Sequence, residues 1–173
     1  FCNQSKKKSG IKDLHYLTVW SGKSASTTGY VEKFNKFKKD NPTEFKLLID
    51  EMTKVSTEGI EAIETEKVDD FLENYDKYFY LLKQLNTKIG LDVITLEHQL
   101  IYDIARQNGV YYKSSGAGGG DLGILFSNDK ERLTFVKNDL EKAGFETLAI
   151  QFGTPGIKET KLRGVVNAEL THP

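Results

Sequence analysis

The chain has 173 residues, of which 38% are hydrophobic and 28% are charged, and its net charge is -1. A domain of this size buries roughly two thirds of its unfolded surface, so it needs neither disulfides nor a structural metal to be stable. The single cysteine, Cys2, excludes an internal disulfide, and no apolar run approaches the ~20 residues of a membrane-spanning helix. The chain begins at Phe1 and its only methionine is Met52, so we expect a piece of a longer polypeptide or a chain that has lost a leader.

The charge is unevenly distributed along the chain. The first 40 residues carry nine Lys and three acidic residues, whereas residues 41–105 carry six Lys and fourteen acidic residues. A nucleic-acid binder is expected to show a coherent basic face, and here a Lys-rich terminus is followed by an acidic helical stretch. We therefore expect a cytoplasmic protein with no nucleic-acid partner and no membrane partner.

The first two thirds of the chain predict one strand followed by helices. A short apolar run over residues 15–20 predicts the strand, which Ser21-Gly22 ends. Apolar residues at helical spacing then predict four helices, which run from Thr27 or Thr28 to Asn41, from Asn41 to about Ile63, from Val68 to Lys88 and from Thr95 to Gln107. Threonine and Asn41 are the expected N-caps of the first two helices, and Gly90 is the expected C-cap of the third.

The last third returns to strands. Short apolar runs predict strands over 110–113 and 122–126, Asn128 is the expected N-cap of a helix that ends at Gly144, and a final strand is predicted over 146–152. The resulting β-α-β-β-α-β order predicts the α+β class, as a ferredoxin-like antiparallel sheet with helices on one face and a first crossover expanded to four helices. We expect a single domain, with a core over 12–156, a Lys-rich arm over 1–11 and a tail over 157–173.

A glycine-rich loop separates the two strands of the last third. Its sequence, Ser114-Ser115-Gly116-Ala117-Gly118-Gly119-Gly120-Asp121, holds four glycines within five positions, which exceeds what a hairpin turn requires. Glycine permits positive φ, so such a loop can point successive N–H groups inward as a nest for an anion such as phosphate. A flexible hairpin tip is the alternative interpretation. The loop is neither a Walker A sequence nor a dinucleotide fingerprint.

Two segments resemble motifs of the GHMP kinase superfamily. The segment from Lys113 to Asp121 resembles the third motif of that superfamily, in the form with a terminal Asp that is typical of the phosphomevalonate kinase family. The segment Val19-Trp20-Ser21-Gly22-Lys23-Ser24-Ala25-Ser26-Thr27-Thr28 resembles the family segment that closes a strand with Trp-Thr/Ser-Gly and enters a helix on Ser/Thr. The resemblance covers about residues 12–156 and implies the fold of the C-terminal domain of the family. The N-terminal ATP-binding domain has no counterpart in this chain.

The resemblance implies a reaction as well as a fold. The family moves the γ-phosphoryl group of ATP onto 5-phosphomevalonate, which gives 5-diphosphomevalonate in the mevalonate route to isoprenoids. ATP and Mg²⁺ would be bound mainly by the N-terminal domain of the same longer chain, so we assign no catalytic residue here and expect the fragment to be inactive alone. Two alternatives stay open: another GHMP small-molecule kinase or decarboxylase, or a non-catalytic ferredoxin-like ligand-binding module.

The resemblance also implies roles for individual residues. Ser115, Gly116 and Ala117 would face the substrate phosphate, Gly118, Gly119 and Gly120 would line the phosphoryl-transfer region, and Asp121 would brace the loop or lie near the metal. Thr27, Thr28 and Lys23 are further candidates for contact with an anion, with helix capping and a solvated lysine as the simpler interpretations. His98 has no second ligand at helical spacing, so we expect no metal site there.

Overall fold

The computed structural model describes residues 11–24, 26, 28–116 and 118–150. The elements follow in the order β1 (His15–Trp20), α1 (Tyr30–Asp40), α2 (Pro42–Glu64), α3 (Val68–Ile89), α4 (Leu96–Gln107), β2 (Tyr111–Ser114), β3 (Leu122–Ser127), α5 (Lys130–Lys142) and β4 (Glu146–Leu148). None of these helices combines the length and the apolar composition that crossing a membrane requires. The predicted order of strands and helices is confirmed.

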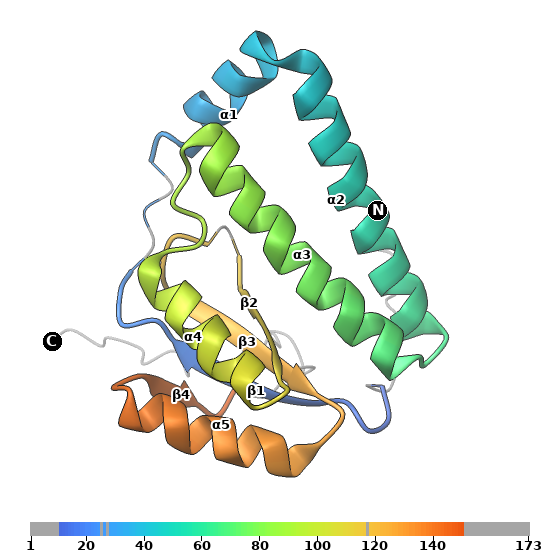
Figure 1. The fold of residues 1–173 in the computed structure, drawn as a ribbon, viewed down its shortest axis with the longest axis vertical. Coiled ribbons are helices and arrows are strands. Elements are labelled where there is room, and N and C mark those ends of the chain that lie inside the picture. The colour runs from blue at the N-terminus through green and yellow to red at the C-terminus, as the bar shows by residue number, and fades with distance from the viewer. Residues whose placement is uncertain (1–10, 25, 27, 117, 151–173) are drawn as a thin grey trace, which may run out of the picture.

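The four strands form one sheet in the spatial order β2-β3-β1-β4, and every neighbouring pair is antiparallel. In the register, Leu125 of β3 lies opposite Leu17 of β1 on one side and Tyr112 of β2 on the other. This is the strand order of a split β-α-β fold, and α1 to α4 all lie in the first crossover between β1 and β2 (Figure 1). The predicted α+β, ferredoxin-like fold with an expanded crossover is confirmed.

The main core lies between the sheet and the helices α4 and α5. Alternation along the strands points Val19, Tyr112 and Leu125 toward this core, where they are fully buried. The helices contribute their apolar stripes to the same cluster, which includes Ile101, Tyr102 and Ala105 of α4 and Leu133, Val136 and Leu140 of α5. The core therefore fixes α4 beside β2, next to the strand that leads into the glycine loop.

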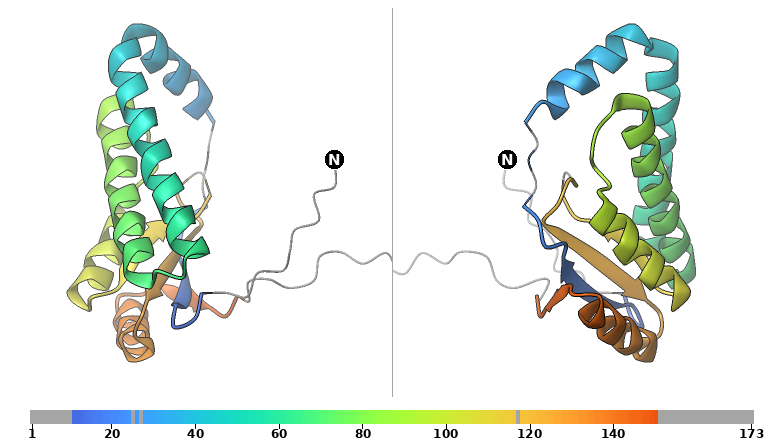
Figure 2. Two further views of the ribbon diagram at one scale, coloured as in Figure 1. Left: turned by 90° about the vertical axis from the view of Figure 1, so that its right-hand side faces the viewer. Right: turned by 60° about the vertical axis from the view of Figure 1, so that its left-hand side comes forward.

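Helices α2 and α3 form a long antiparallel hairpin beside the sheet (Figures 1 and 2). The hairpin has a smaller core of its own, formed by Leu48, Val55, Leu81 and Leu85. Helix α3 joins the hairpin to the sheet, because Phe79 stacks on Tyr102 in the main core while Phe71 and Tyr75 contact Phe126 of β3.

Two of the predicted N-caps differ from the structure, and a third, Asn41, is confirmed in position but makes no capping hydrogen bond. Helix α1 begins at Tyr30 after Gly29, whose φ of 82° makes the turn, so Thr28 is not its cap and Thr27 lies outside the described residues. Asn41 is at once the C-cap of α1 and the N-cap of α2, and its side chain makes no capping hydrogen bond. Asp129 caps α5 by accepting from two helix amides, because the Asn128 amide donates to Asp69 instead.

Two element ends can also be compared with their predictions. Gly90 ends α3 in the left-handed conformation, with φ 70°, as predicted. Strand β4 ends at Leu148, so it is shorter than the strand predicted over 146–152, whose last two residues lie outside the described residues.

Gly123 of β3 provides a direct test of this packing. A β-carbon at this position would overlap the ring and hydroxyl of Tyr112, which is fully buried. We therefore expect Gly123→Ala to lower the free energy of unfolding by about 1–3 kcal/mol, measured by urea denaturation. The matched control is Gly59→Ala in α2, where the nearest atom would be 3.8 Å away, so a higher helix propensity should raise stability by about 0.5–1 kcal/mol. Equal effects of the two substitutions would contradict the packing described here.

Candidate functional site

The glycine loop between β2 and β3 is held by hydrogen bonds from three of its own amides. The amide of Ser115 donates to the carbonyl of Leu122 at 2.8 Å, and that of Gly119 donates to the carbonyl of Val93 at 2.8 Å. The amide of Asp121 donates to the carbonyl of Lys23 at 2.6 Å, and the Asp121 carbonyl accepts from the amide of Ser21 at 2.8 Å. The two motifs identified in the sequence therefore meet through their main chains, at Ser21 to Lys23 and at Asp121.

The amides of three loop glycines make no hydrogen bond to the described residues. Gly116, Gly118, Gly119 and Gly120 all have positive φ, between 66° and 144°. Among the described residues, no acceptor is found for the N–H groups of Gly116, Gly118 or Gly120. Loop amides that anchor the loop therefore stand next to loop amides with no acceptor among the described residues.

The connection between α3 and α4 forms the wall against which the loop packs. The Asn86 side chain shapes this connection, because its Oδ1 accepts from the amides of Val93 and Ile94 and its Nδ2 donates to the carbonyl of Ile94. Val93 in turn accepts from the amide of Gly119, and a β-carbon on Gly118 would overlap the Val93 carbonyl. The close approach of the two segments therefore requires glycine at position 118.

A buried histidine joins the loop to the core. His98 of α4 is fully buried, and its Nε2 lies 3.0 Å from the carbonyl oxygen of Gly120 while its Nδ1 lies 2.5 Å from the Tyr112 hydroxyl. A carbonyl only accepts, so Nε2–H is the donor and Nδ1 accepts the proton of the phenol. Burial lowers the pKa of His98, which keeps the imidazole neutral in this arrangement. The predicted absence of a metal at His98 stays untested, but its two ring nitrogens are both occupied.

A cavity of about 480 Å³ lies beside the loop, between the start of α1 and the start of α4. It brings together three of the predicted site residues, Lys23, Thr28 and Gly119. It also holds residues that were not among the predicted site residues, namely Ser24 and Ser26 of the second motif and Tyr30, Lys33, Asp92, Thr95, Leu96 and Glu97 outside both motifs. The lining carries two lysines and two carboxylates, so its side-chain charges balance, and the N-termini of two helices and several hydroxyl groups add donors that an anion can accept from.

The cations of this cavity are held by specific partners. Lys23 forms an ion pair with Glu97 at 2.5 Å, and Lys33 donates to the carbonyl of Gly90 at 2.7 Å. The Lys23 contact, with the backbone amide of Glu97 and the Thr95 hydroxyl, lowers the pKa of Glu97 to about 2. Lys23 is therefore oriented over the site although its side chain is 64% exposed.

The other predicted site residues have the following positions. Ser115 and Gly116 lie at the end of β2 and do not line the cavity, while Gly118 and Gly120 are buried next to Gly119. Asp121 has a φ of 57° and braces the loop through its main chain. Ala117 and Thr27 lie outside the described residues. The cavity residues that were not predicted from the sequence come mainly from the α3–α4 connection and the start of α4. The one sequence signal in this segment was Thr95 at the predicted start of α4.

The His98 bridge generates the first prediction for this site. Tyr112→Phe keeps the ring but removes the donor to Nδ1, so a buried acceptor is left unsatisfied and the free energy of unfolding should fall by about 1–3 kcal/mol at pH 7. Tyr78→Phe is the control, since the described residues offer no hydrogen-bond partner to its hydroxyl, and we expect a change below about 0.5 kcal/mol. Equal stability of Tyr112→Phe and the unsubstituted chain in urea titrations would contradict a stabilising hydrogen bond between the Tyr112 hydroxyl and His98 Nδ1.

The Lys23–Glu97 pair generates a pH-dependent prediction. Because the pKa of Glu97 is lowered from 4.5 to about 2, its contribution is present above about pH 4.5 and is lost as the pH falls toward 2. Glu97→Gln should therefore be less stable than the unsubstituted chain at pH 7, by at most about 1 kcal/mol for an exposed pair, and the difference should vanish near pH 2. Thermal unfolding across this pH range measures it. A difference that persists unchanged at pH 2 would show that the ion pair is not its cause.

The sequence and the fold were compared with known proteins. No family model matches the sequence. The phosphomevalonate kinase of Streptomyces sp. (strain CL190) is 26% identical over 148 residues, which cover 84% of this chain and 40% of that protein. The chain therefore spans about two fifths of the length of this curated relative.

Solved structures show the same relationship in three dimensions. The Lin0012 protein from Listeria innocua has a TM-score of 0.74 and 28% identity, over 78% of this chain and 38% of that one. The phosphomevalonate kinase of Streptococcus pneumoniae, solved with phosphomevalonate and AMPPNP, has a TM-score of 0.66 and 25% identity, over 79% of this chain and 38% of that one. The resemblance predicted from the sequence is confirmed: in sequence and in fold, this chain is similar to phosphomevalonate kinases.

Proposed function

We propose that this chain forms the C-terminal domain of an ATP-dependent kinase that phosphorylates 5-phosphomevalonate to 5-diphosphomevalonate. The observation that carries the proposal is the glycine loop, in which the amides of Gly116, Gly118 and Gly120 have no acceptor among the described residues while neighbouring amides anchor the loop. Relatives named phosphomevalonate kinase, one of them solved with phosphomevalonate and AMPPNP, support this choice of substrate and of ATP.

The residues of the site have distinct tasks in this proposal. The amides of Gly116, Gly118 and Gly120, with that of Ala117, would receive phosphate oxygens, which a nest of N–H groups neutralises without mobile side-chain charge. Lys23 and Lys33, at the edge of the cavity, would add positive charge, and Thr28 a hydroxyl. Burial, with Asp92 nearby, raises the pKa of Tyr30, so its hydroxyl next to Gly119 remains a protonated donor. Phosphoryl transfer needs positioning and charge neutralisation of this kind.

The proposed domain is incomplete as a catalyst. Within the described residues, no group of three or more His, Cys, Asp or Glu side chains could hold a metal ion, and Glu97 is already paired with Lys23. Mg²⁺ is usually held by one or two carboxylates together with substrate phosphates, and in this proposal the N-terminal domain would supply most of those ligands with the bound ATP. We therefore propose that an N-terminal domain supplies the ATP site, that the core of this domain covers residues 12–156, and that the 173-residue chain alone is inactive.

The test uses the complete protein that contains this chain. We expect it to convert 5-phosphomevalonate and ATP to 5-diphosphomevalonate and ADP, followed by ³¹P NMR, and we expect no turnover by the 173-residue chain. Gly119→Val should reduce turnover at least ~100-fold, because Gly119 has φ 79° and a β-carbon there would lie 2.6 Å from the Tyr30 hydroxyl. The far-ultraviolet circular dichroism should not change.

The control for Gly119→Val is Gly144→Ala, since Gly144 also has positive φ but nothing lies within 4 Å of its β-carbon position. It should keep full turnover. Failure of the complete protein to consume 5-phosphomevalonate with ATP would reject the proposed reaction, and release of CO₂ from the diphosphate would indicate the decarboxylase instead. Normal turnover by Gly119→Val would show that the loop is only a hairpin.

A further inference from the structure

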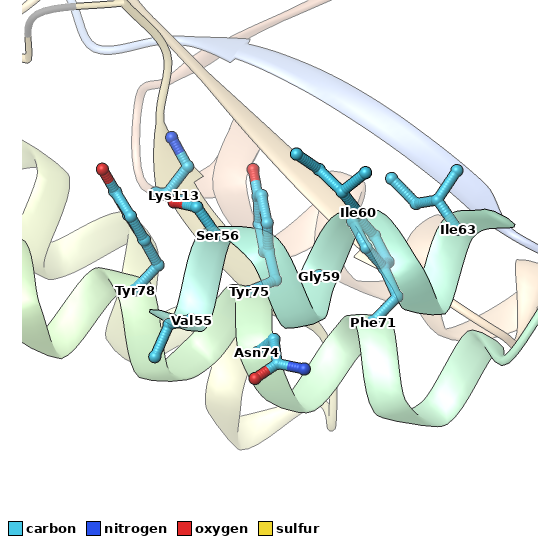
Figure 3. Close-up of a pocket in the computed structure, with 10 residues that line it drawn as sticks. All are labelled: Val55, Ser56, Gly59, Ile60, Ile63, Phe71, Asn74, Tyr75, Tyr78 and Lys113. Carbon is cyan, nitrogen blue, oxygen red and sulfur yellow. The ribbon is translucent and has the colours of Figure 1, made fainter. Parts of the chain in front are cut away.

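A second cavity lies between α2, α3 and β2, with a volume of about 330 Å³ (Figure 3). It shares no lining residue with the cavity beside the glycine loop. Most of its lining is apolar or aromatic, with Val55, Ile60 and Ile63 from α2 and Phe71, Tyr75 and Tyr78 from α3. Nothing in the proposed kinase reaction uses this cavity.

Lys113 supplies the only charge among the described residues that line this cavity. It follows Tyr112, which faces the main core, so the alternation of β2 directs Lys113 to the opposite face of the sheet. Its Nζ donates to the carbonyl of Ser114 at 2.8 Å and lies 5.7 Å and 5.6 Å from the ring centroids of Tyr75 and Tyr78. Figure 3 shows the Lys113 side chain between these two rings. Lys113 is therefore half-buried among aromatic rings.

The surroundings of Lys113 leave its charge without a counterion. In the described part of the chain, no carboxylate pairs with it, and burial lowers its pKa. The two aromatic faces and one carbonyl compensate part of the desolvation, as cation–π contacts do. The Lys113 ammonium is half-buried, and a charge removed from water is normally paired, so an incoming anion would complete this site.

The mouth of the cavity favours a ligand with an apolar body. Ile60 and Ile63 line the cavity and yet are 59% and 41% exposed, so both present apolar surface to water. Covering this surface is favourable in proportion to the area removed from water. The volume lies at the lower end of the range for small-molecule pockets, which limits the ligand to a short chain or a small ring.

We propose that this cavity binds a small amphipathic anion, with its charged head on the Lys113 ammonium and its apolar body between α2 and α3. The site is separate from the glycine loop, and the proposal holds whether or not the chain is part of a kinase.

The test is a titration of the 173-residue chain with octanoate, an eight-carbon carboxylate, followed by ¹H–¹⁵N NMR. We expect saturable binding, with shifts concentrated on the amides of β2, α2 and α3. Lys113→Met should weaken binding at least ~10-fold, since it removes the charge but keeps the apolar stem. Lys77→Met is the matched control, because Lys77 lies on α3 but is exposed and paired with Glu73, and it should bind octanoate as the unsubstituted chain does.

A second variant covers the case in which Lys113→Met fails to fold. Ile60→Glu places a carboxylate at the mouth on an already exposed position, so the fold should be kept and octanoate binding should be lost. 1-Octanol, which lacks the charge, should bind at least ~10-fold more weakly than octanoate. The proposal is overturned if octanoate shows no saturable binding, if 1-octanol binds equally well, or if folded Lys113→Met or Ile60→Glu binds octanoate with unchanged affinity.

Discussion

The buried imidazole of His98 fixes the position of the glycine loop relative to the core. Its Nε2–H holds the Gly120 carbonyl and its Nδ1 accepts from Tyr112, so one side chain of α4 links a core residue of β2 to the loop that follows this strand. The phenol of Tyr112 can lie there only because Gly123 on the neighbouring strand has no side chain. A neutral, fully hydrogen-bonded imidazole gives the loop a rigid support that a solvated hairpin tip would not have.

The close packing of the loop against the protein explains why it contains so many glycines. Gly118 lies against the Val93 carbonyl and Gly119 against the Tyr30 hydroxyl, so no side chain fits at either position. The loop glycines all have positive φ values, which turn successive N–H groups in different directions. The Gly119 amide donates to the Val93 carbonyl, whereas the amides of Gly118 and Gly120 have no acceptor among the described residues. In the proposed function, anchoring and phosphate binding would thus be divided between neighbouring peptide groups, and the hydrogen-bonded amides would hold the others in place.

The sequence predicted the order of the elements because apolar periodicity reflects burial, and burial here follows the ferredoxin-like topology closely. The N-caps of α1 and α5 were mispredicted for local reasons: Gly29 makes the turn into α1, and the Asn128 amide donates to Asp69. The motifs indicated Lys23, Thr28 and Gly119. Asp92 and Glu97 reach the site through the α3–α4 connection and the start of α4, and no motif marks this connection, whose shape depends on hydrogen bonds from the Asn86 side chain to the backbone of Val93 and Ile94. The position of Lys113 in the second cavity was not predicted, because a charged residue is expected to be exposed to solvent, whereas its neighbours in space are the rings of Tyr75 and Tyr78.

The central claim is that the loop amides receive the phosphate of the substrate. A crystal structure of the complete protein with 5-phosphomevalonate tests it most directly. We expect phosphate oxygens at hydrogen-bond distance, about 2.7–3.2 Å, from the amides of Gly116, Gly118 or Gly120, with the bond between His98 and Gly120 retained. A phosphate bound elsewhere in the protein, with none of these amides in contact with it, would contradict the account.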